Sequence, residues 1–214
     1  MTRRCAVLLV SGELASAAAP VVIDATALGR AMVADVAETL HDLSGVDSLV
    51  VCPPERESEL RPLLWADVPL SVEGPADLRS ALAAAAQRGY TEAVVVGHDA
   101  PDLPQMILAK MFQALASSPV ALAPADGGGA VALGAVLPLS DWLAEWLDHA
   151  RPALDLPSLA EDLRAAAPRP GSVRVTPGWH RLREPADLRR LDPGLEGWES
   201  TRALLSGLRT PGEA

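Results

Sequence analysis

The sequence is poor in cysteine, in positive charge and in long apolar runs, and each shortage excludes a class of protein. Two cysteines cannot form a disulfide framework or a cysteine metal cluster. Because Cys5 and Cys52 both lie in apolar, strand-like runs, we expect buried, reduced thiols in a cytoplasmic protein. Lys and Arg number 18 against 28 Asp and Glu, a formal net charge of −10 spread along the chain, so nucleic acid is not an expected partner. No apolar run reaches the roughly 18–20 residues of a membrane span, so a membrane partner is not expected either.

Two common catalytic patterns are also missing. The chain has no Gly-x-Ser-x-Gly nucleophile motif, and its four histidines have no close partners at the spacing of zinc ligands. His98 is a special case because it lies beside Asp99. It is a candidate metal ligand or general base, and the alternative is a loop histidine that is merely hydrogen-bonded to the neighbouring carboxylate.

The order of the predicted elements indicates a single α/β domain. Apolar runs predict strands and helical spacing predicts helices, in an alternation typical of a mostly parallel sheet with helices on both faces. The expected strands cover residues 5–10, 46–52, 68–72, 93–97, 120–124 and 172–176, and the expected helices cover 27–43, 55–64, 75–88, 104–116 and 185–191. The 68–72 strand should be an edge strand because it contains a proline. In this interpretation residues 1–214 form one domain, with a core over 5–191 and a C-terminal tail over 192–214.

Prolines separate short helices beyond residue 134. Ser140 is the expected N-cap of a helix that carries Trp142 and Trp146 four residues apart, which places both indoles on one face. Packing against the core is the simpler interpretation of these tryptophans. An aromatic platform that binds an acceptor is the alternative.

Two of the predicted strands lead to a carboxylate. The run 93–97 leads to Asp99, and the run 120–124 leads to Asp126, which is followed by three glycines. The carboxyl ends of parallel strands share one edge of a sheet, where ligands bind in open α/β folds, and glycine lets a backbone approach a ligand closely. The pair is therefore a candidate site for Mg²⁺ or Mn²⁺ with a phosphate attached, because these ions prefer carboxylate oxygen. The alternative is a pair of ordinary turns, since Asp near Pro and runs of Gly are common in loops.

These motifs also carry a resemblance to a known family. Gly97-His-Asp-Ala-Pro-Asp-Leu103 is similar to a Gly-Ser/Thr-Asp-x-Pro-x-Leu motif, and Pro124-Ala-Asp-Gly-Gly-Gly129 is similar to Pro-Ala-x-Asp-Gly-Gly-Tyr. The segment from Trp179 to Leu188 aligns with Trp-Tyr-Asp-Val-Asp-Thr-Pro-x-Asp-Leu. Over roughly residues 27–191 the chain thus resembles the arsenosugar-biosynthesis-type bacterial glycosyltransferases, which are GT-A relatives of the molybdopterin and phospholactate nucleotidyltransferases.

The resemblance implies a GT-A three-layer sandwich and a specific site. It implies a glycosyltransferase that moves a sugar or related group from a nucleotide-activated donor to a small-molecule acceptor, with Mg²⁺ or Mn²⁺ as cofactor. Together with the strand-end pattern it points to Asp99 as the metal ligand and to Asp99, Asp126 and His98 as catalytic residues. The residues expected to bind the donor are Gly97, Asp102, Gly127, Gly128, Arg181 and Arg183.

The chain departs from the family pattern in three places. The family's basic loop after the first strand is missing, because loop 11–20 carries no Lys or Arg. The two acids of the last motif are Arg181 and Arg183 here, which would repel a metal, and the aromatic residue after Gly-Gly is Gly129. These departures support an alternative, a catalytically degenerate GT-A protein that binds or regulates a protein partner through the two arginines and the two tryptophans. A nucleotidyltransferase is a further alternative, and arginine could also neutralise a pyrophosphate leaving group without metal.

Overall fold

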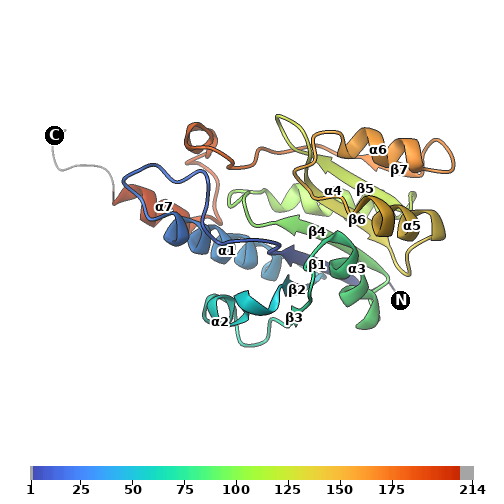
Figure 1. Ribbon diagram of the computed structural model, residues 1–214, viewed down its shortest axis with the longest axis horizontal. Coiled ribbons are helices and arrows are strands. Elements are labelled where there is room, and N and C mark those ends of the chain that lie inside the picture. Colours follow the sequence, from blue (N-terminus) through green and yellow to red (C-terminus); the bar gives the residue numbers. More distant parts are fainter. Residues whose placement is uncertain (1, 208–214) are drawn as a thin grey trace.

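The chain folds into one mixed sheet with helices on both of its faces (Figure 1). The computed structural model describes residues 2–207. The strands are β1 (Arg4–Leu9), β2 (Asp47–Cys52), β3 (Leu70–Val72), β4 (Glu92–Gly97), β5 (Val120–Pro124), β6 (Ala130–Val136) and β7 (Val173–Val175). Their order across the sheet is β3-β2-β1-β4-β6-β5-β7. β6 runs antiparallel to β4 and β5, whereas the other neighbouring pairs are parallel, so the predicted fold class is confirmed.

The helices expected at 27–43, 75–88 and 104–116 form, whereas 55–64 is a one-turn helix between two 3₁₀ turns and 185–191 forms only a 3₁₀ turn. The helices are α1 (Ala25–His41), α2 (Glu57–Leu60), α3 (Leu78–Gln87), α4 (Gln105–Leu115), α5 (Asp141–Ala150), α6 (Leu159–Ala166) and α7 (Glu199–Ser206), with 3₁₀ turns η1 (Pro54–Arg56), η2 (Arg61–Leu63) and η3 (Pro185–Arg190). α3 begins three residues later than Pro75, because Asp77 forms a capping box with Ser80. Ser140 occupies the N-cap position of α5, but its hydroxyl makes no capping hydrogen bond.

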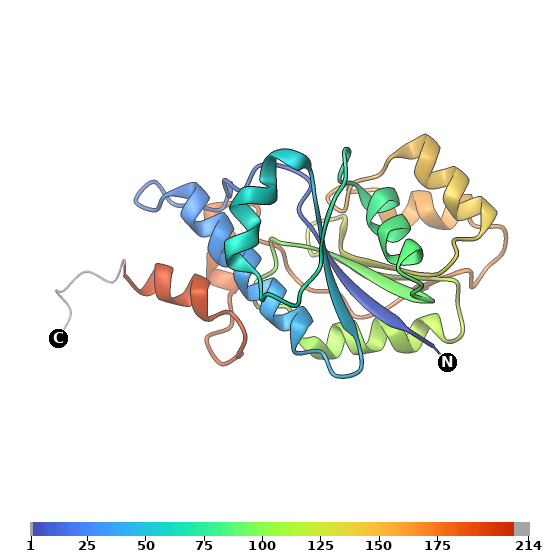
Figure 2. The same cartoon turned by 90° about the horizontal axis from the view of Figure 1, so that it is seen from below.

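Each strand contributes side chains to two apolar cores. Successive residues of a strand point to opposite faces, so Leu8 and Val96 pack with α1, α2 and α4, while Val7 and Val95 pack with α3, α5 and α6. Figure 2 shows α4 on one side of the strands and α3 and α5 on the other. Trp142 and Trp146 of α5 are partly buried against the second core, which supports the core-packing interpretation of the two indoles.

Strand β6 is an element that the sequence analysis did not predict. It is a fully apolar run that turns back after the three glycines and inserts between β4 and β5. A Cβ at Gly134 would lie 3.1 Å from Val94 Cγ2 and 3.3 Å from Leu115 Cδ1. Gly134 therefore lets β4 and α4 pack closely against β6.

The segment expected to be a C-terminal tail packs onto the domain as far as residue 207. α7 lies alongside α1 in both views (Figure 1, Figure 2). Asp35, fully buried on α1, accepts hydrogen bonds from the backbone N–H groups of Ser200 and Thr201, both at 2.8 Å, and so caps the first turn of α7. Trp198 and Leu182 join α1 in a third apolar cluster. Residues 208–214 of the expected tail lie outside the described residues.

Two composition-based expectations concern the thiols and the membrane. Cys5 and Cys52 are free and buried, as predicted. Burial raises the pKa of Cys5 to about 12 and that of Cys52 to about 11. Within residues 2–207, no helix combines the length and the apolarity needed to span a membrane.

Candidate functional site

A cavity of about 160 Å³ opens at the carboxyl ends of β1 and β4. The chain builds β2 and β3 on one side of β1 and then crosses to β4 on the other side, so strand order reverses at this gap. Ligands of open α/β sheets bind at such a reversal point. Leu9, Gly97 and His98 line the cavity from the strand ends, and the start of α3, the loop 151–155 and Arg181 complete its wall.

Asp99 and Arg181 form a forked ion pair beside this cavity. Arg181 Nε lies 2.8 Å from Asp99 Oδ1 and 2.9 Å from Oδ2, and Arg181 Nη2 lies 2.8 Å from Oδ2. The Arg181 side chain is 10% exposed, and the Asp99 side chain is 16% exposed. A Cβ at Gly97 would lie 3.1 Å from Asp99 Oδ1, so glycine leaves room for the pair against the end of β4. Both oxygens of the predicted metal ligand are therefore engaged by a guanidinium.

The segment that carries Arg181 is fixed across the strand ends. Trp179 forms backbone hydrogen bonds with residues at the end of β5, and the backbone N–H of Leu182 donates to Asp99 O at 2.7 Å. Arg181 Nη1 donates to Ala130 O at 3.2 Å, at the start of β6. The guanidinium is thus held by the ends of β4 and β6 at once, which leaves it little freedom to move.

Arg183 brings a second guanidinium to the same loop. Its Nη2 donates to Gly128 O at 2.9 Å, and its Nε is buried without a partner among the described residues. Burial lowers the pKa of Arg183, and the positive charge of Arg181 lowers it further. This arginine therefore has unused hydrogen-bonding capacity close to Arg181.

The glycine-rich loop mostly serves the packing of the chain itself. Gly129 has φ +76°, and a Cβ there would lie 2.5 Å from Leu154 O. Gly128 has φ +101°, and a Cβ there would lie 3.3 Å from Pro157. Gly127 has φ +80° with open space around it. The close approach predicted for a ligand is thus made by the segment 154–157 at Gly128 and Gly129, and Gly127 alone of the three glycines faces open space.

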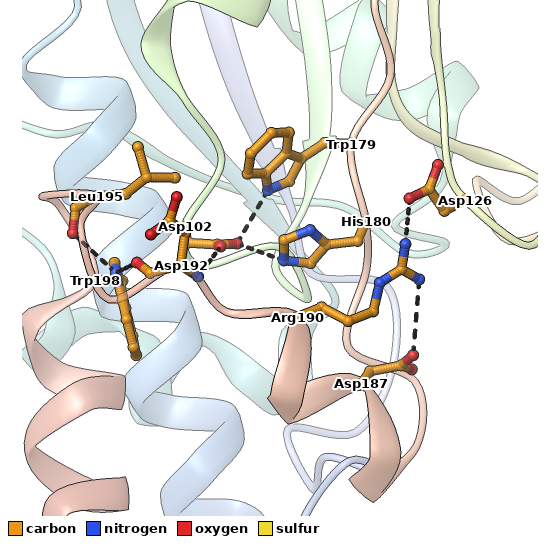
Figure 3. Close-up of polar contacts among 9 residues, drawn as sticks. All are labelled: Asp102, Asp126, Trp179, His180, Asp187, Arg190, Asp192, Leu195 and Trp198. Carbon is orange, nitrogen blue, oxygen red and sulfur yellow. Dashed lines mark hydrogen bonds and ion pairs between the residues drawn. The ribbon is translucent and has the colours of Figure 1, made fainter.

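Asp126 lies at the same edge of the sheet as Asp99, with β6 between the two strands that they follow. It is exposed and forms an ion pair with Arg190, which also approaches Asp187 to 4.0 Å (Figure 3). The position of Asp99 and Asp126 at one edge of the sheet agrees with the expectation from the strand pattern. The catalytic role of Asp126 remains a prediction.

Asp102 is buried and surrounded by protein donors. It is 2% exposed, and its Oδ1 accepts a hydrogen bond from Trp179 Nε1 at 3.1 Å, while its Oδ2 accepts one from the backbone N–H of Asp192 at 3.3 Å (Figure 3). His180 Nε2 also lies 3.0 Å from Oδ1, although without the alignment of a hydrogen bond. These contacts join the loop after β4 to the C-terminal segment, so the geometry favours a structural role over the predicted contact with a donor.

His98 lines the cavity from the end of β4. Burial lowers the pKa of His98, the nearby Arg181 lowers it further, and Asp99 opposes both effects. A lowered pKa favours the neutral imidazole, which is the form that can accept a proton.

The residues present do not fit the divalent cation that the resemblance implies. Within residues 2–207, no group of three His, Cys, Asp or Glu side chains is placed to hold a metal ion. Both Asp99 oxygens already accept hydrogen bonds from Arg181, so a cation bound to either would lie beside the positive guanidinium. A single carboxylate beside a fixed guanidinium is a poor site for Mg²⁺ or Mn²⁺.

Several cavity residues were not singled out in the sequence. Ser11, Asp77, Arg151 and Asp155 all line the cavity. Their positions along the chain carry no shared motif, and they meet because loops from both halves of the sheet converge at its carboxyl edge. Loop 11–20 has no Lys or Arg, and the guanidinium groups of this cavity come from residues 151 and 181, next to the two aspartates.

Solved structures share this fold at low sequence identity. A provisionally assigned nucleotide-diphospho-sugar transferase from Desulfovibrio desulfuricans is 20% identical with a TM-score of 0.69, over 97% of this chain and 98% of the other. Rv0371c from Mycobacterium tuberculosis, solved in complex with manganese, is 17% identical with a TM-score of 0.51, over 96% and 98%. CMP:2-keto-3-deoxy-manno-octonic acid synthetase complexed with CTP is 11% identical with a TM-score of 0.56, over 97% and 99%.

At these identities the likeness shows the fold, which is that of nucleotide-diphospho-sugar transferases and cytidylyltransferases. No functionally curated protein matches the sequence. A family profile matches residues 36–145, just over half of the chain. The chain therefore belongs to the bacterial family described as "uncharacterized protein conserved in bacteria" (DUF2064).

Proposed function

We propose that the protein is a transferase that binds a nucleotide-activated donor in the cleft between β1 and β4 and moves a sugar or nucleotidyl group to a small acceptor. The observation that carries the proposal is the cavity at the point of strand reversal, with a fixed arginine and a histidine in its wall. The narrower resemblance to arsenosugar-biosynthesis-type glycosyltransferases, and a cytoplasmic location, belong to the same proposal.

The size of the cavity indicates how a donor would lie. About 160 Å³ is less than the roughly 300–1,000 Å³ of ordinary small-molecule sites, so the cavity encloses a part of the donor. Leu9, Leu78 and Leu154 offer apolar walls, and Arg151 and Arg181 offer guanidinium N–H donors for phosphate oxygens. The remainder of the donor would extend along the open carboxyl edge of the sheet.

The residues in the wall suit a displacement at the donor. For sugar transfer, the bond between the sugar carbon and the diphosphate oxygen breaks and the diphosphate keeps the electron pair. The acceptor oxygen bonds to that carbon, and its hydroxyl proton passes to His98. Arg181 stabilises the charge that develops on the leaving group. In the nucleotidyl alternative the acceptor oxygen attacks the α-phosphorus of a nucleoside triphosphate, and pyrophosphate leaves.

Calorimetry against nucleotide sugars and nucleoside triphosphates tests the proposal. We expect at least one donor to bind, and the matching nucleoside diphosphate to compete with it. In a turnover assay with that donor, His98→Ala should lower the rate about 100-fold, the usual scale of general-base catalysis. His149→Ala is the matched control, because this exposed histidine lies on α5 and contacts the backbone of Glu145. Failure of every donor to bind would remove the proposal.

A second candidate is a binding protein that keeps the fold and has lost the reaction. The engagement of both Asp99 oxygens by Arg181 favours it, as does the absence of Lys and Arg from loop 11–20. Such a protein would bind a donor, or a protein partner, without turning over any substrate. Donor binding with no turnover across a panel of acceptors would support this candidate over the transferase.

A further inference from the structure

Arg181 is oriented in a way that leaves part of its guanidinium free. An arginine side chain has five N–H groups. The Nε–H and one N–H of Nη2 face Asp99, and one N–H of Nη1 faces Ala130 O. One N–H on each of Nη1 and Nη2 is therefore available to a ligand, and Arg181 is part of the cavity wall.

Asp99 fixes the orientation of the Arg181 side chain. Its two oxygens accept hydrogen bonds from Nε and Nη2 of Arg181 in a planar, forked arrangement. This arrangement fixes the direction of the remaining N–H groups of Arg181. The pair as a whole is close to neutral. Arg183 adds positive charge nearby, since no Asp or Glu oxygen in residues 2–207 lies within ion-pair distance of its guanidinium, and its buried Nε has no partner.

We propose that Arg181, held by Asp99, occupies the functional place of the divalent cation and binds the phosphate groups of the ligand directly, so that binding in this cleft does not depend on metal. The identity of the ligand as a nucleotide-activated donor rests on the proposed function, whereas the recognition of a phosphate or diphosphate group does not. In this arrangement Arg181 contacts the ligand, and Asp99 is a positioning residue that acts through Arg181.

The physical reason for metal-independent binding is that the fixed guanidinium of Arg181 takes the place of a metal ion. A metal ion bound to Asp99 would place positive charge at the carboxylate, and Arg181, which lines the cavity, already places it there together with two N–H groups that these contacts leave unused. The guanidinium is permanently protonated and matches the geometry of phosphate oxygens. A metal at Asp99 would have to bind beside the largely buried guanidinium that engages both oxygens, and within residues 2–207 no group of three ligating side chains is placed to hold it.

The first test is calorimetry of the full chain with inorganic pyrophosphate and with nucleoside diphosphates, in EDTA and in Mn²⁺. We expect the affinity for pyrophosphate in the two conditions to agree within about threefold, because the cation belongs to the protein. Pyrophosphate binding that appears in Mn²⁺ and is absent in EDTA would overturn the inference while leaving the proposed function intact. Pyrophosphate binding in EDTA without binding of any nucleotide would contradict the proposed function and leave the inference standing. No binding in either condition would overturn both.

The second test uses variants of the pair. Arg181→Gln should weaken pyrophosphate binding about 10- to 100-fold, the scale of losing charge-assisted hydrogen bonds. Because this change leaves Asp99 without its partner, the double variant Arg181→Gln with Asp99→Asn replaces the ion pair by a neutral amide pair, and it should show the same loss while its melting temperature verifies folding. Arg79→Gln is the control, since Arg79 forms a more exposed pair with Asp148 on α5 at 3.0 Å. Unchanged pyrophosphate affinity in the folded double variant would overturn the inference.

The third test asks whether Arg181 excludes the ion. Arg181→Asp brings a second carboxylate to Asp99, so this variant should bind Mn²⁺ at least about tenfold more tightly than the original chain. If the original chain binds Mn²⁺ as tightly as Arg181→Asp does, Arg181 does not exclude the metal and the inference is wrong.

Discussion

Replacing Asp102 tests whether its carboxylate stabilises the fold or binds the ligand. Asp102→Ala leaves Trp179 Nε1 and the backbone N–H of Asp192 without their acceptor, in a region where residue 102 is 2% exposed. Hydrogen bonds to a charged group contribute about 1.5–3 kcal/mol each. The bond from Asp192 is long at 3.3 Å and counts at the low end, so we expect a loss of about 3–5 kcal/mol in the free energy of unfolding. Burial this complete leaves little solvent screening to reduce the effect.

Urea denaturation followed by circular dichroism measures this loss. With a slope near 2 kcal/mol per molar, the midpoint should fall by roughly 2 M at an unchanged slope. Ligand affinity of the folded variant should stay within about threefold of the original. Asp126→Asn is a matched control at the same edge, because its exposed ion pair with Arg190 contributes at most about 1 kcal/mol. A stability loss below about 1 kcal/mol together with a tenfold loss of ligand affinity would show that Asp102 binds the ligand and that the structural interpretation is wrong.

Three further changes test other parts of the structure. Burial raises the pKa of Asp35 above its ordinary value of 3.8, so the folded state takes up a proton at a higher pH than the unfolded state does. The free energy of unfolding of the original chain, relative to that of Asp35→Asn, should therefore rise as the pH falls from 7 toward 4. If urea titrations show this difference falling instead, the buried geometry is contradicted. Cys5 and Cys52 should not react with a thiol reagent at pH 8 in the folded protein, and both should react in urea, because their raised pKa values leave almost no thiolate; rapid labelling of the folded chain would refute this. Gly129→Ala should cost about 2 kcal/mol or more, since φ is +76° and Leu154 O occupies the space of the new methyl, and an unchanged melting temperature would count against that contact.

The sequence by itself determined where most of the strands lie along the chain and which carboxylates follow them. Buried parallel strands are continuous apolar runs, so β1, β2, β4 and β5 could be located from local composition, and Asp99 and Asp126 had to emerge at the same edge. The helices between them follow from spacing and capping signals that act within a few residues. Strand β6 was missed because a glycine inside an apolar run indicates a break locally, whereas its actual use is close packing against β4.

The tertiary structure decided which of the predicted site residues face a ligand. Arg181 lies 82 positions from Asp99 in the chain, and no local pattern reveals that the two side chains form a forked pair. Asp102 and Asp99 belong to one motif, but Trp179 and the backbone of Asp192 engage Asp102 in the interior. The same applies to Asp35, whose cap on α7 joins residues 165 positions apart. Local sequence fixes where a charged side chain leaves the backbone, and its chemistry depends on which distant charges and donors the folded chain brings within hydrogen-bonding distance.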